Sequence, residues 1–392
     1  MAGTADAESL ATGQPATVTC SPPARDFYID RLRSIMTALV LLHHTSITYG
    51  APGGWFWYEL HPSATLVGML LTMFVSTNQA YFMGFFFLLA GYFTPRSLER
   101  KGYARFLGDR CLRLGLPLLA FGFFLGPLTV AMITAFEGRG FWSTFADLWH
   151  HRQFINGPLW FAQALLMFSL AYCLWRVFFG TPLGAARRAP KAVPSYRAWL
   201  LSAVGVGALA LAIRQFVPTG VNVIGLQLGY FSSYIFLFAA GIAAWRHDWL
   251  RQLTWQHALP WIITLGIAWP LLYIGVAAAR SMHGADFSGR WSWPAVLYAF
   301  WEPFVAWGLI SGWLLFARSR MNAPSPFWNW VNRRAYAVYI IHPPVLVGLS
   351  LLLHGFVAPA LVKVAVTGTL TVAAAWLLAD PLVRLPGVRR VV

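Results

Sequence analysis

The chain of 392 residues contains a series of apolar segments, each long enough to cross a bilayer as a helix. A window of roughly 19 residues finds about ten of them, at approximately 31–50, 66–93, 114–136, 157–179, 198–217, 227–245, 258–279, 294–317, 334–353 and 360–380. Hydrophobic residues make up 58% of the chain and charged residues 11%, which is typical of a polytopic membrane protein. The predicted fold class is therefore all-α, a helical membrane bundle of about ten transmembrane helices in a lipid bilayer.

Lys and Arg gather on one side of the predicted bundle. On that side lie Arg25, Arg31, Arg33, Arg96, Arg100, Lys101, Arg105, Arg110, Arg113, Arg187, Arg188, Lys191, Arg197, Arg318, Arg320, Arg333, Arg334, Arg389 and Arg390, and the other side has mainly Arg139, Arg152, Arg280, Arg290 and Lys363. With an even number of spans, the positive-inside rule places both termini in the cytoplasm. The net charge of +16 is thus explained by topology, and no nucleic-acid partner is expected.

The ends of the chain are polar. Residues 1–24 lack the charged-then-apolar order of a cleaved signal peptide, and we predict a disordered cytoplasmic tail over 1–24, a membrane domain over 25–384 and a short cytoplasmic tail over 385–392. Cys20, Cys111 and Cys173 form no Cys-x-x-Cys pair. We therefore expect free thiols and no structural metal.

The first apolar segment carries ionisable side chains at both ends. A helix advances ~100° and ~1.5 Å per residue, so Arg33 and His44 lie within ~20° on one face and ~16.5 Å apart along the axis. Ionisable residues in a span are functional candidates, and His suits proton transfer near neutral pH. This face is predicted to form half of an active site. His43 points ~100° away and is interpreted as packed or hydrogen-bonded between helices.

Two further features carry chemistry. Arg110 and Arg113, three residues apart on a predicted short helix, present two guanidinium groups suited to phosphate oxygens, although topology alone also explains basic residues there.

Glu302, beside Pro303 in the eighth segment, is the best candidate for a carboxylate partner of His44; the alternative is a satisfied polar contact at a proline kink. Candidates to line a substrate path are Asn78, Gln79, Trp160, Gln163 and His342.

Trp-rich sequences mark the predicted outer loops. Gly53-Gly54-Trp55 and Trp291-Ser292-Trp293 fit an aromatic belt at the membrane interface, and they also fit a platform for a sugar or a lipid headgroup. The sequence leaves both interpretations open.

These residues together resemble the acyltransferase-3 family of integral membrane acyltransferases, which includes O-acetylases of polysaccharides and a branch that succinylates periplasmic glucans. The resemblance runs from about Phe27 to the last span. It is carried by Arg33 with His44, by Arg110-x-x-Arg113 followed by Pro117, and by the sequences 82–93, 157–161 and 336–344. The sequences 43–50 and 53–55 look closer to the glucan-modifying branch.

The resemblance implies a function and a location. An acyl-CoA donor would be held from the cytoplasm by Arg110, Arg113 and Arg33, and no metal is implied. His44 would be the general base, or would carry the acyl group, in transfer of an acetyl or succinyl type group to a hydroxyl of an extracytoplasmic carbohydrate or similar small-molecule acceptor. The expected location is the bacterial inner membrane, as a multi-pass O-acyltransferase. A succinyl carboxylate would require a nearby cation such as Arg214.

A second class of function stays open, a secondary transporter or flippase in which His44 and Glu302 relay protons. It does not predict the Arg33-to-His44 spacing or the pair Arg110 and Arg113. The sequence contains no Gly-rich nucleotide loop, His-Glu-x-x-His or Ser nucleophile elbow, which argues against an ATP-driven pump and a zinc hydrolase. The acyl group, the acceptor and the oligomeric state stay open.

Overall fold

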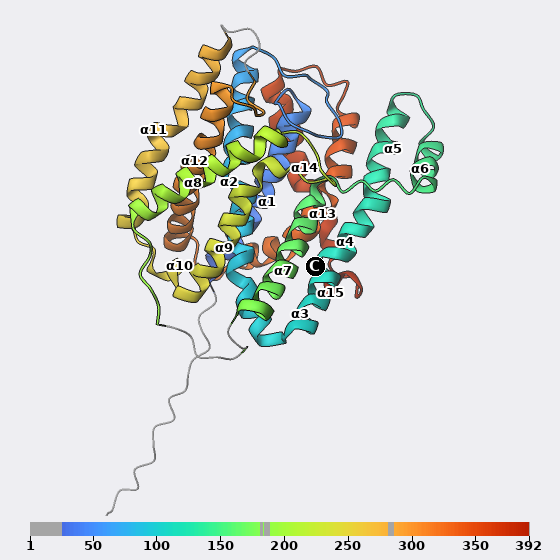
Figure 1. Ribbon diagram of the computed structural model, residues 1–392. Helices are drawn as coiled ribbons and strands as arrows, with labels where there is room; N and C mark the ends of the chain where they lie inside the picture. The colour runs from blue at the N-terminus through green and yellow to red at the C-terminus, as the bar shows by residue number, and fades with distance from the viewer. Residues whose placement is uncertain (1–25, 181–182, 184–188, 281–285, 392) are drawn as a thin grey trace, which may run out of the picture.

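The computed structural model describes residues 26–180, 183, 189–280 and 286–391 of the chain (Figure 1). The predicted tail 1–24 lies outside these residues, as do Arg25, Arg187, Arg188 and the side chain of Arg280. The described ranges are built of helices, and their only β-type pairings are isolated bridges between Tyr49 and Leu60 and between Val223 and Leu226.

The helices follow the predicted spans closely. They are α1 (Phe27–Thr48), α2 (Leu66–Lys101), α3 (Tyr103–Arg110), η1 (Cys111–Gly115), α4 (Leu116–Ala120), η2 (Phe121–Leu125), α5 (Gly126–Phe136), α6 (Phe141–His150), η3 (Gly157–Leu159), α7 (Trp160–Phe179), α8 (Tyr196–Phe216), η4 (Leu228–Tyr230), α9 (Phe231–His247), α10 (Trp249–Gln252), α11 (Trp255–Arg280), α12 (Trp293–Arg320), α13 (Pro326–Leu352), α14 (Ala360–Leu382) and α15 (Val388–Val391).

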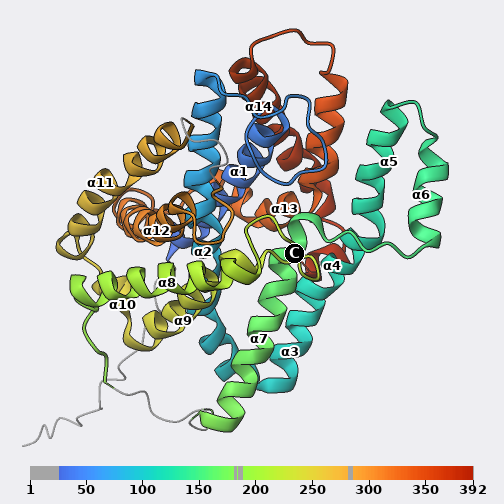
Figure 2. The ribbon, with the colours of Figure 1, turned by 45° about the horizontal axis from the view of Figure 1, so that its top comes forward.

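Within the described residues, nine helical segments are long and apolar enough to cross a membrane. The 22-residue α1 is not among them, because its arginines and histidines lower its hydropathy. It lies inside the bundle, packed against α2, α12, α13 and α14 (Figures 1 and 2). Since neighbouring helices cover it, α1 carries polar residues that a lipid-facing helix would not tolerate. The predicted all-α polytopic bundle is confirmed.

Close helix packing brings α2 and α9 together along much of their length. A Cβ atom added at Gly91 would lie 2.1 Å from the carbonyl oxygen of Phe238, and one added at Gly241 would lie 2.1 Å from that of Leu88. Only glycine allows backbones to approach so closely. This pair of helices fixes one wall of the cavity described below.

The segment from Tyr103 to Phe136 is one continuous helix with two π-helical turns, η1 and η2. Each π turn precedes a proline, Pro117 or Pro127. Proline has no N–H for the carbonyl four residues earlier and its ring crowds that carbonyl, and a π turn relieves the crowding. Arg110 therefore ends α3, while Arg113 lies in η1 rather than on the same short helix as predicted.

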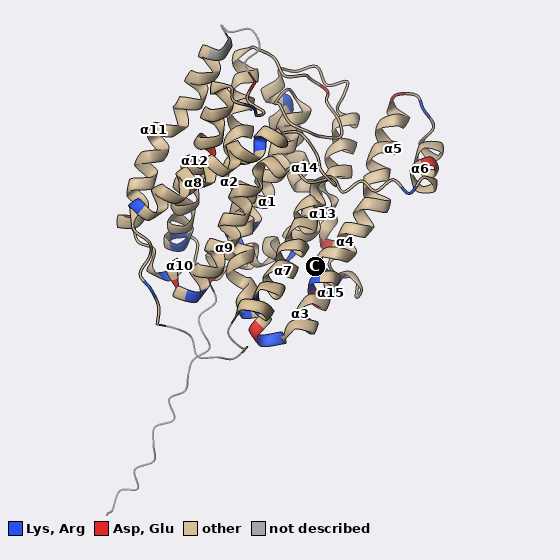
Figure 3. Cartoon of the chain, in the orientation of Figure 1, with Lys and Arg blue, Asp and Glu red and all other residues tan. Residues whose placement is uncertain are grey.

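Most Lys and Arg residues gather at one end of the bundle, which we call the arginine-rich end (Figure 3). The start of α1 is tied there, because the backbone N–H of Tyr28 donates to Asn322 at 3.3 Å. The last described helix, α15, packs on η1 at the same end. The first and last spans thus begin and end on one side, which by the positive-inside rule is the cytoplasm.

Candidate functional site

Two histidines from distant parts of the chain meet inside the bundle. Nδ1 of His44, near the end of α1, lies 3.1 Å from Nε2 of His342 on α13. The two rings are parallel within 1°, with centroids 5.2 Å apart. One nitrogen of this pair must donate and the other must accept, so the direction of the hydrogen bond depends on how each ring is protonated.

Pro343 decides that direction. Because proline has no N–H, the carbonyl of Tyr339, four residues earlier in α13, receives no helical hydrogen bond from position 343. Nδ1 of His342 lies 2.7 Å from that carbonyl, and a carbonyl only accepts, so Nδ1 of His342 carries a proton. In the neutral ring Nε2 then holds a lone pair and accepts from Nδ1–H of His44.

The same reasoning leaves His44 with a lone pair on Nε2. His342 is fully buried, whereas His44 is partly exposed and lines a cavity. The pair can thus take up one proton at Nε2 of His44, with His342 orienting the ring and sharing the charge. An oriented imidazole with a free nitrogen facing a cavity has the geometry of a general base or a nucleophile.

Trp55 covers the other face of His44. Its ring lies parallel to the imidazole within 12°, with centroids 3.9 Å apart. The loop that carries Trp55 is anchored at both ends: the hydroxyl of Tyr49 contacts that of Thr367 at 3.0 Å, and the buried carboxylate of Glu59 forms an ion pair with Lys363 on α14. The loop therefore fixes His44 between Trp55 and His342.

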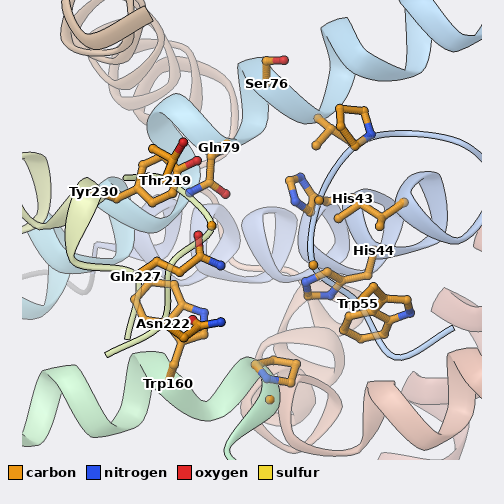
Figure 4. Close-up of a pocket in the computed structure, with 18 of the residues that line it drawn as sticks. His43, His44, Trp55, Ser76, Gln79, Trp160, Thr219, Asn222, Gln227 and Tyr230 are labelled. Carbon is orange, nitrogen blue, oxygen red and sulfur yellow. The ribbon is translucent and has the colours of Figure 1, made fainter. Parts of the chain in front are cut away.

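The cavity has a volume of about 960 Å³. Its lining includes the loops 52–56, 155–158 and 219–227, which connect helices at the end opposite the arginine-rich one. Figure 4 shows two facing walls: His43, His44 and Trp55 form one, and uncharged polar side chains form the other, namely Gln79, Thr219, Asn222, Gln227 and Tyr230. The described lining contains no Asp, Glu, Lys or Arg.

A buried ion pair stands behind the polar wall. Arg214 on α8 is fully buried and donates to the carboxylate of Glu302 on α12 and, at 3.0 Å, to the carbonyl of Gly229. Its guanidinium also lies 5.2 Å from the ring centroids of both Tyr230 and Tyr298. These contacts hold two tyrosines that line the cavity.

Glu302 therefore has a different partner from the one the sequence suggested. The described hydrogen bonds join His44 to His342, and Glu302 to Arg214. The physical reason is that two buried opposite charges stabilise each other far better than a carboxylate and a neutral ring do. These contacts do not join His44 directly to Glu302 in a proton relay.

The three arginines assigned to the donor lie together at the arginine-rich end. Arg110 donates to the hydroxyl of Thr94 at 3.2 Å and lies over the ring of Phe106. The charges of Arg33 and Arg113 both act on Arg110, although Arg33 comes from α1. Its side chain is 52% exposed and lies 3.9 Å from Asp30. The fold thus brings Arg33 of α1 to the end of the bundle that carries Arg110 and Arg113.

One face of α13 connects the two ends of the site. The hydroxyl of Tyr336 donates at 2.7 Å to the carbonyl of Arg113, which receives no α-helical hydrogen bond from Pro117 because proline has no N–H. Tyr339 follows one turn later and donates to the carbonyl of Pro158, and His342 follows after another turn. Successive rings lie 6.4 and 5.9 Å apart. This aromatic stripe runs from the arginines to the histidine pair.

Most of the chain matches a known protein family. A family model described as an acyltransferase domain, Acyl_transf_3, matches residues 26–380. This chain belongs to the acyltransferase-3 family. No curated protein and no solved structure gives a significant match. Together with the membrane-spanning helices, family membership shows a multi-pass membrane acyltransferase, and the resemblance found in the sequence is confirmed.

The remaining residues predicted from the sequence occupy different places in this acyltransferase-3 protein. Trp160 lines the cavity. Asn78 is buried in α2 and is not part of the lining. Gln163 joins the start of α7 to a loop, through Asn156 and the carbonyl of Ile224, both at 3.0 Å. His342 is sealed behind His44, so it would act on a substrate only through that ring.

Most of the polar wall was not predicted from the sequence. The loop between α8 and α9 contributes Thr219, Asn222 and Gln227, and a loop lacks the helical periodicity from which the direction of a side chain can be predicted. The Gly53-Gly54-Trp55 stretch drew attention to Trp55, but it gave no indication that the indole packs on His44. Among the described residues, no group of three or more His, Cys, Asp or Glu side chains is placed to hold a metal ion.

Proposed function

We propose that this protein transfers an acyl group from cytoplasmic acyl-CoA to a hydroxyl of an extracytoplasmic carbohydrate, with His44 as the general base. The observation that carries the proposal is the pairing of His44 with His342, which leaves Nε2 of His44 free on the wall of a large cavity. Acyl transfer to an alcohol requires removal of the hydroxyl proton as the oxygen attacks.

In the direct route, Nε2 of His44 takes the proton of the acceptor hydroxyl while its oxygen bonds to the thioester carbon. Collapse of the tetrahedral intermediate then breaks the carbon–sulfur bond, and His44 returns the proton to the leaving thiolate. The products are an ester and free CoA. In the relay route, Nε2 first attacks the thioester carbon, the carbon–sulfur bond breaks and the thiolate leaves. The acceptor hydroxyl then attacks the acyl-imidazole, the carbon–nitrogen bond breaks to restore the neutral ring, and the hydroxyl proton passes to the thiolate. Both routes require the same free nitrogen.

The lining of the cavity supports a neutral, hydroxyl-rich acceptor. Amide and hydroxyl groups that donate and accept hydrogen bonds lie on the same side of the cavity as Trp160 and face Trp55 across the space, and aromatic rings with convergent polar groups suit sugar rings. The lining also favours an uncharged acyl group such as acetyl. Arg214, the cation suggested for a succinyl carboxylate, is buried and bonded to Glu302.

The arginine-rich end supports the donor half of the proposal. Guanidinium groups bind phosphate oxygens in two-point contacts, and Arg33, Arg110 and Arg113 lie close enough for their charges to interact. The aromatic stripe of α13 then marks the direction that the pantetheine arm of acyl-CoA would follow to His44. Glu302 is assigned a positioning role, through Arg214, for the tyrosines of the polar wall.

Binding of a non-hydrolysable acetyl-CoA analogue to the purified protein tests the donor half. Wild type is compared with Arg110→Ala/Arg113→Ala at several ionic strengths, with Arg139→Ala, an exposed cation at the opposite end, as the control. We expect saturable binding that weakens with salt, is lost in the double variant and is kept in the control. Equal binding by wild type and the double variant would remove these arginines from the donor site.

Thiol release from acetyl-CoA tests the chemical half, with a neutral glucan oligosaccharide as the acceptor. We expect His44→Ala to abolish acceptor-dependent thiol release while it keeps binding of the analogue and its thermal midpoint. Full activity in this variant would refute the role of His44. Failure of wild type with both acetyl-CoA and succinyl-CoA would refute the proposed reaction.

A further inference from the structure

His43 lines the same cavity as His44 and has no hydrogen-bond partner for its Nδ1 among the described residues. The sequence favoured a packed or hydrogen-bonded role between helices, and the ring does pack on Phe82 with centroids 4.9 Å apart. However, a phenyl ring would pack there equally well. A polar ring that is only 5% exposed and lacks a partner is unusual, because buried polar groups in proteins are nearly always hydrogen-bonded.

The burial of Nδ1 indicates where the proton of His43 sits. A neutral imidazole carries one N–H and one lone pair. Buried N–H groups without a partner are rarer than unpaired acceptors, so the proton is placed on Nε2. Since Nδ1 is sealed and the residue still lines the cavity, the edge of the ring that faces the cavity carries Nε2. His43 thus presents an N–H donor to the cavity.

The two neighbouring rings approach the cavity from different directions. Consecutive residues of a helix point ~100° apart, and the rings of His43 and His44 meet at 80° with centroids 5.4 Å apart. Figure 4 shows both on the same wall. One ring therefore offers a free nitrogen, and the other offers an N–H, to one small volume.

We propose that His43 donates a hydrogen bond from Nε2 to the carbonyl oxygen of the transferred acyl group. This inference rests on the proposed acyl transfer. As the acceptor oxygen bonds to the thioester carbon, the carbonyl electron pair moves to oxygen, and a positioned donor stabilises that oxyanion. His44 takes the proton at the same moment. When the carbon–sulfur bond breaks, the carbonyl re-forms and the thiolate recovers the proton from His44.

Replacement of His43 by Phe keeps the packing and removes the donor, whereas His43→Gln keeps an N–H near the position of Nε2. Removal of one oxyanion donor lowers kcat by about 10² to 10³-fold. We expect that loss in His43→Phe, with the KM for acetyl-CoA little changed, and a partial return of kcat in His43→Gln. Unchanged kcat in a folded His43→Phe preparation would overturn the inference.

A dithioester analogue of acetyl-CoA, in which sulfur replaces the carbonyl oxygen, separates donation from packing. Sulfur accepts hydrogen bonds weakly, so the ratio of oxygen to sulfur rates should be large in wild type and much smaller in His43→Phe. Equal ratios would overturn the role of His43. If His44→Ala is inactive in that assay, the proposed acyl transfer stands even when the role of His43 fails. If His44→Ala is fully active, the proposed function itself fails.

Discussion

The indole of Trp55 and the imidazole of His44 lie flat against each other, with ring centroids 3.9 Å apart and an angle of 12° between the planes. A flexible loop would not hold such a contact by itself, and here the loop is fastened to α14 by Glu59 and Tyr49. The stack restricts the rotation of His44 and keeps its Nε2 toward the cavity.

Replacing Trp55 with Leu should lower kcat without unfolding the protein. Aromatic pairs contribute about 0.5–1.5 kcal/mol beyond area burial, which corresponds to roughly a 2- to 13-fold loss if the stack acts mainly in the transition state. The measurement is kcat and KM for thiol release from acetyl-CoA. Trp291→Leu, at an exposed tryptophan outside the cavity lining, is the matched control and should behave as wild type.

The ion pair between Glu59 and Lys363 should act through that stack. Glu59→Gln removes one charge of a buried pair and leaves Lys363 uncompensated, so the loop should loosen and kcat should fall in step with the Trp55 variant. The exchange Glu59→Lys/Lys363→Glu should recover part of the loss. If kcat is the same in the wild type and in a folded Glu59→Gln preparation, the pair does not position the loop.

Replacing Pro343 with Ala should lower kcat and raise thermal stability. Pro343→Ala supplies an N–H that competes with His342 for the carbonyl of Tyr339, and one such hydrogen bond contributes about 0.5–1.5 kcal/mol. We expect kcat to fall roughly 2- to 13-fold, while the thermal midpoint rises, because proline in a helix interior costs about 3 kcal/mol. A variant that is both more stable and fully active would refute the assigned direction of the His44–His342 hydrogen bond.

His342 itself should be indispensable for orientation and dispensable for binding. His342→Phe removes the acceptor for Nδ1–H of His44, and loss of the orienting partner of a catalytic histidine lowers kcat by up to about 10⁴-fold. His342→Gln, whose amide oxygen can accept from His44, should retain more activity. Analogue binding should be unchanged in both. Weakened binding with unchanged kcat would instead place His342 in the donor site.

Replacing Arg214 alone should destabilise the protein more than replacing Arg214 and Glu302 together. Arg214→Met leaves a buried carboxylate without its partner, which costs about 3–5 kcal/mol, whereas replacing both charges is often nearly neutral. The thermal midpoint should drop strongly in the single variant and recover in Arg214→Met/Glu302→Met. In the double variant, a raised KM for the glucan acceptor would locate the effect in the polar wall. An unchanged KM would show that the wall does not depend on the pair.

Hydropathy and charge alone predicted most boundaries of the helical spans to within a few residues. The principal exception is the third span, which begins at Tyr103 instead of 114, because a basic amphipathic helix reads as a loop on a hydropathy scale. The spacing of Arg33 and His44 was also readable, since both lie on one helix whose geometry is fixed.

The partner of His44 could not be read in this way. Glu302 is the acidic residue deep in its span, which makes it the partner that the sequence favours, yet composition gives no information about how one helix is rotated against another. His342 lies 298 positions from His44, and only the packing of α1 on α13 brings them together. The sequence did contain the decisive residue, Pro343, but its effect on the Tyr339 carbonyl requires the position of His342 in space.

Tyr336, Tyr339 and His342 project from a single rigid helix, spaced three residues apart, so about 9 Å of helix axis separates the ring beside Arg113 from the ring beside His44. A rotation or a slide of α13 would displace both contacts together. The two ends of the proposed site therefore share one rigid element, so a movement of η1 that shifts Tyr336 along the helix axis would also shift His342 against His44. Under the proposed function, binding of a donor on one side of the membrane would reach the proposed base on the other side through this helix.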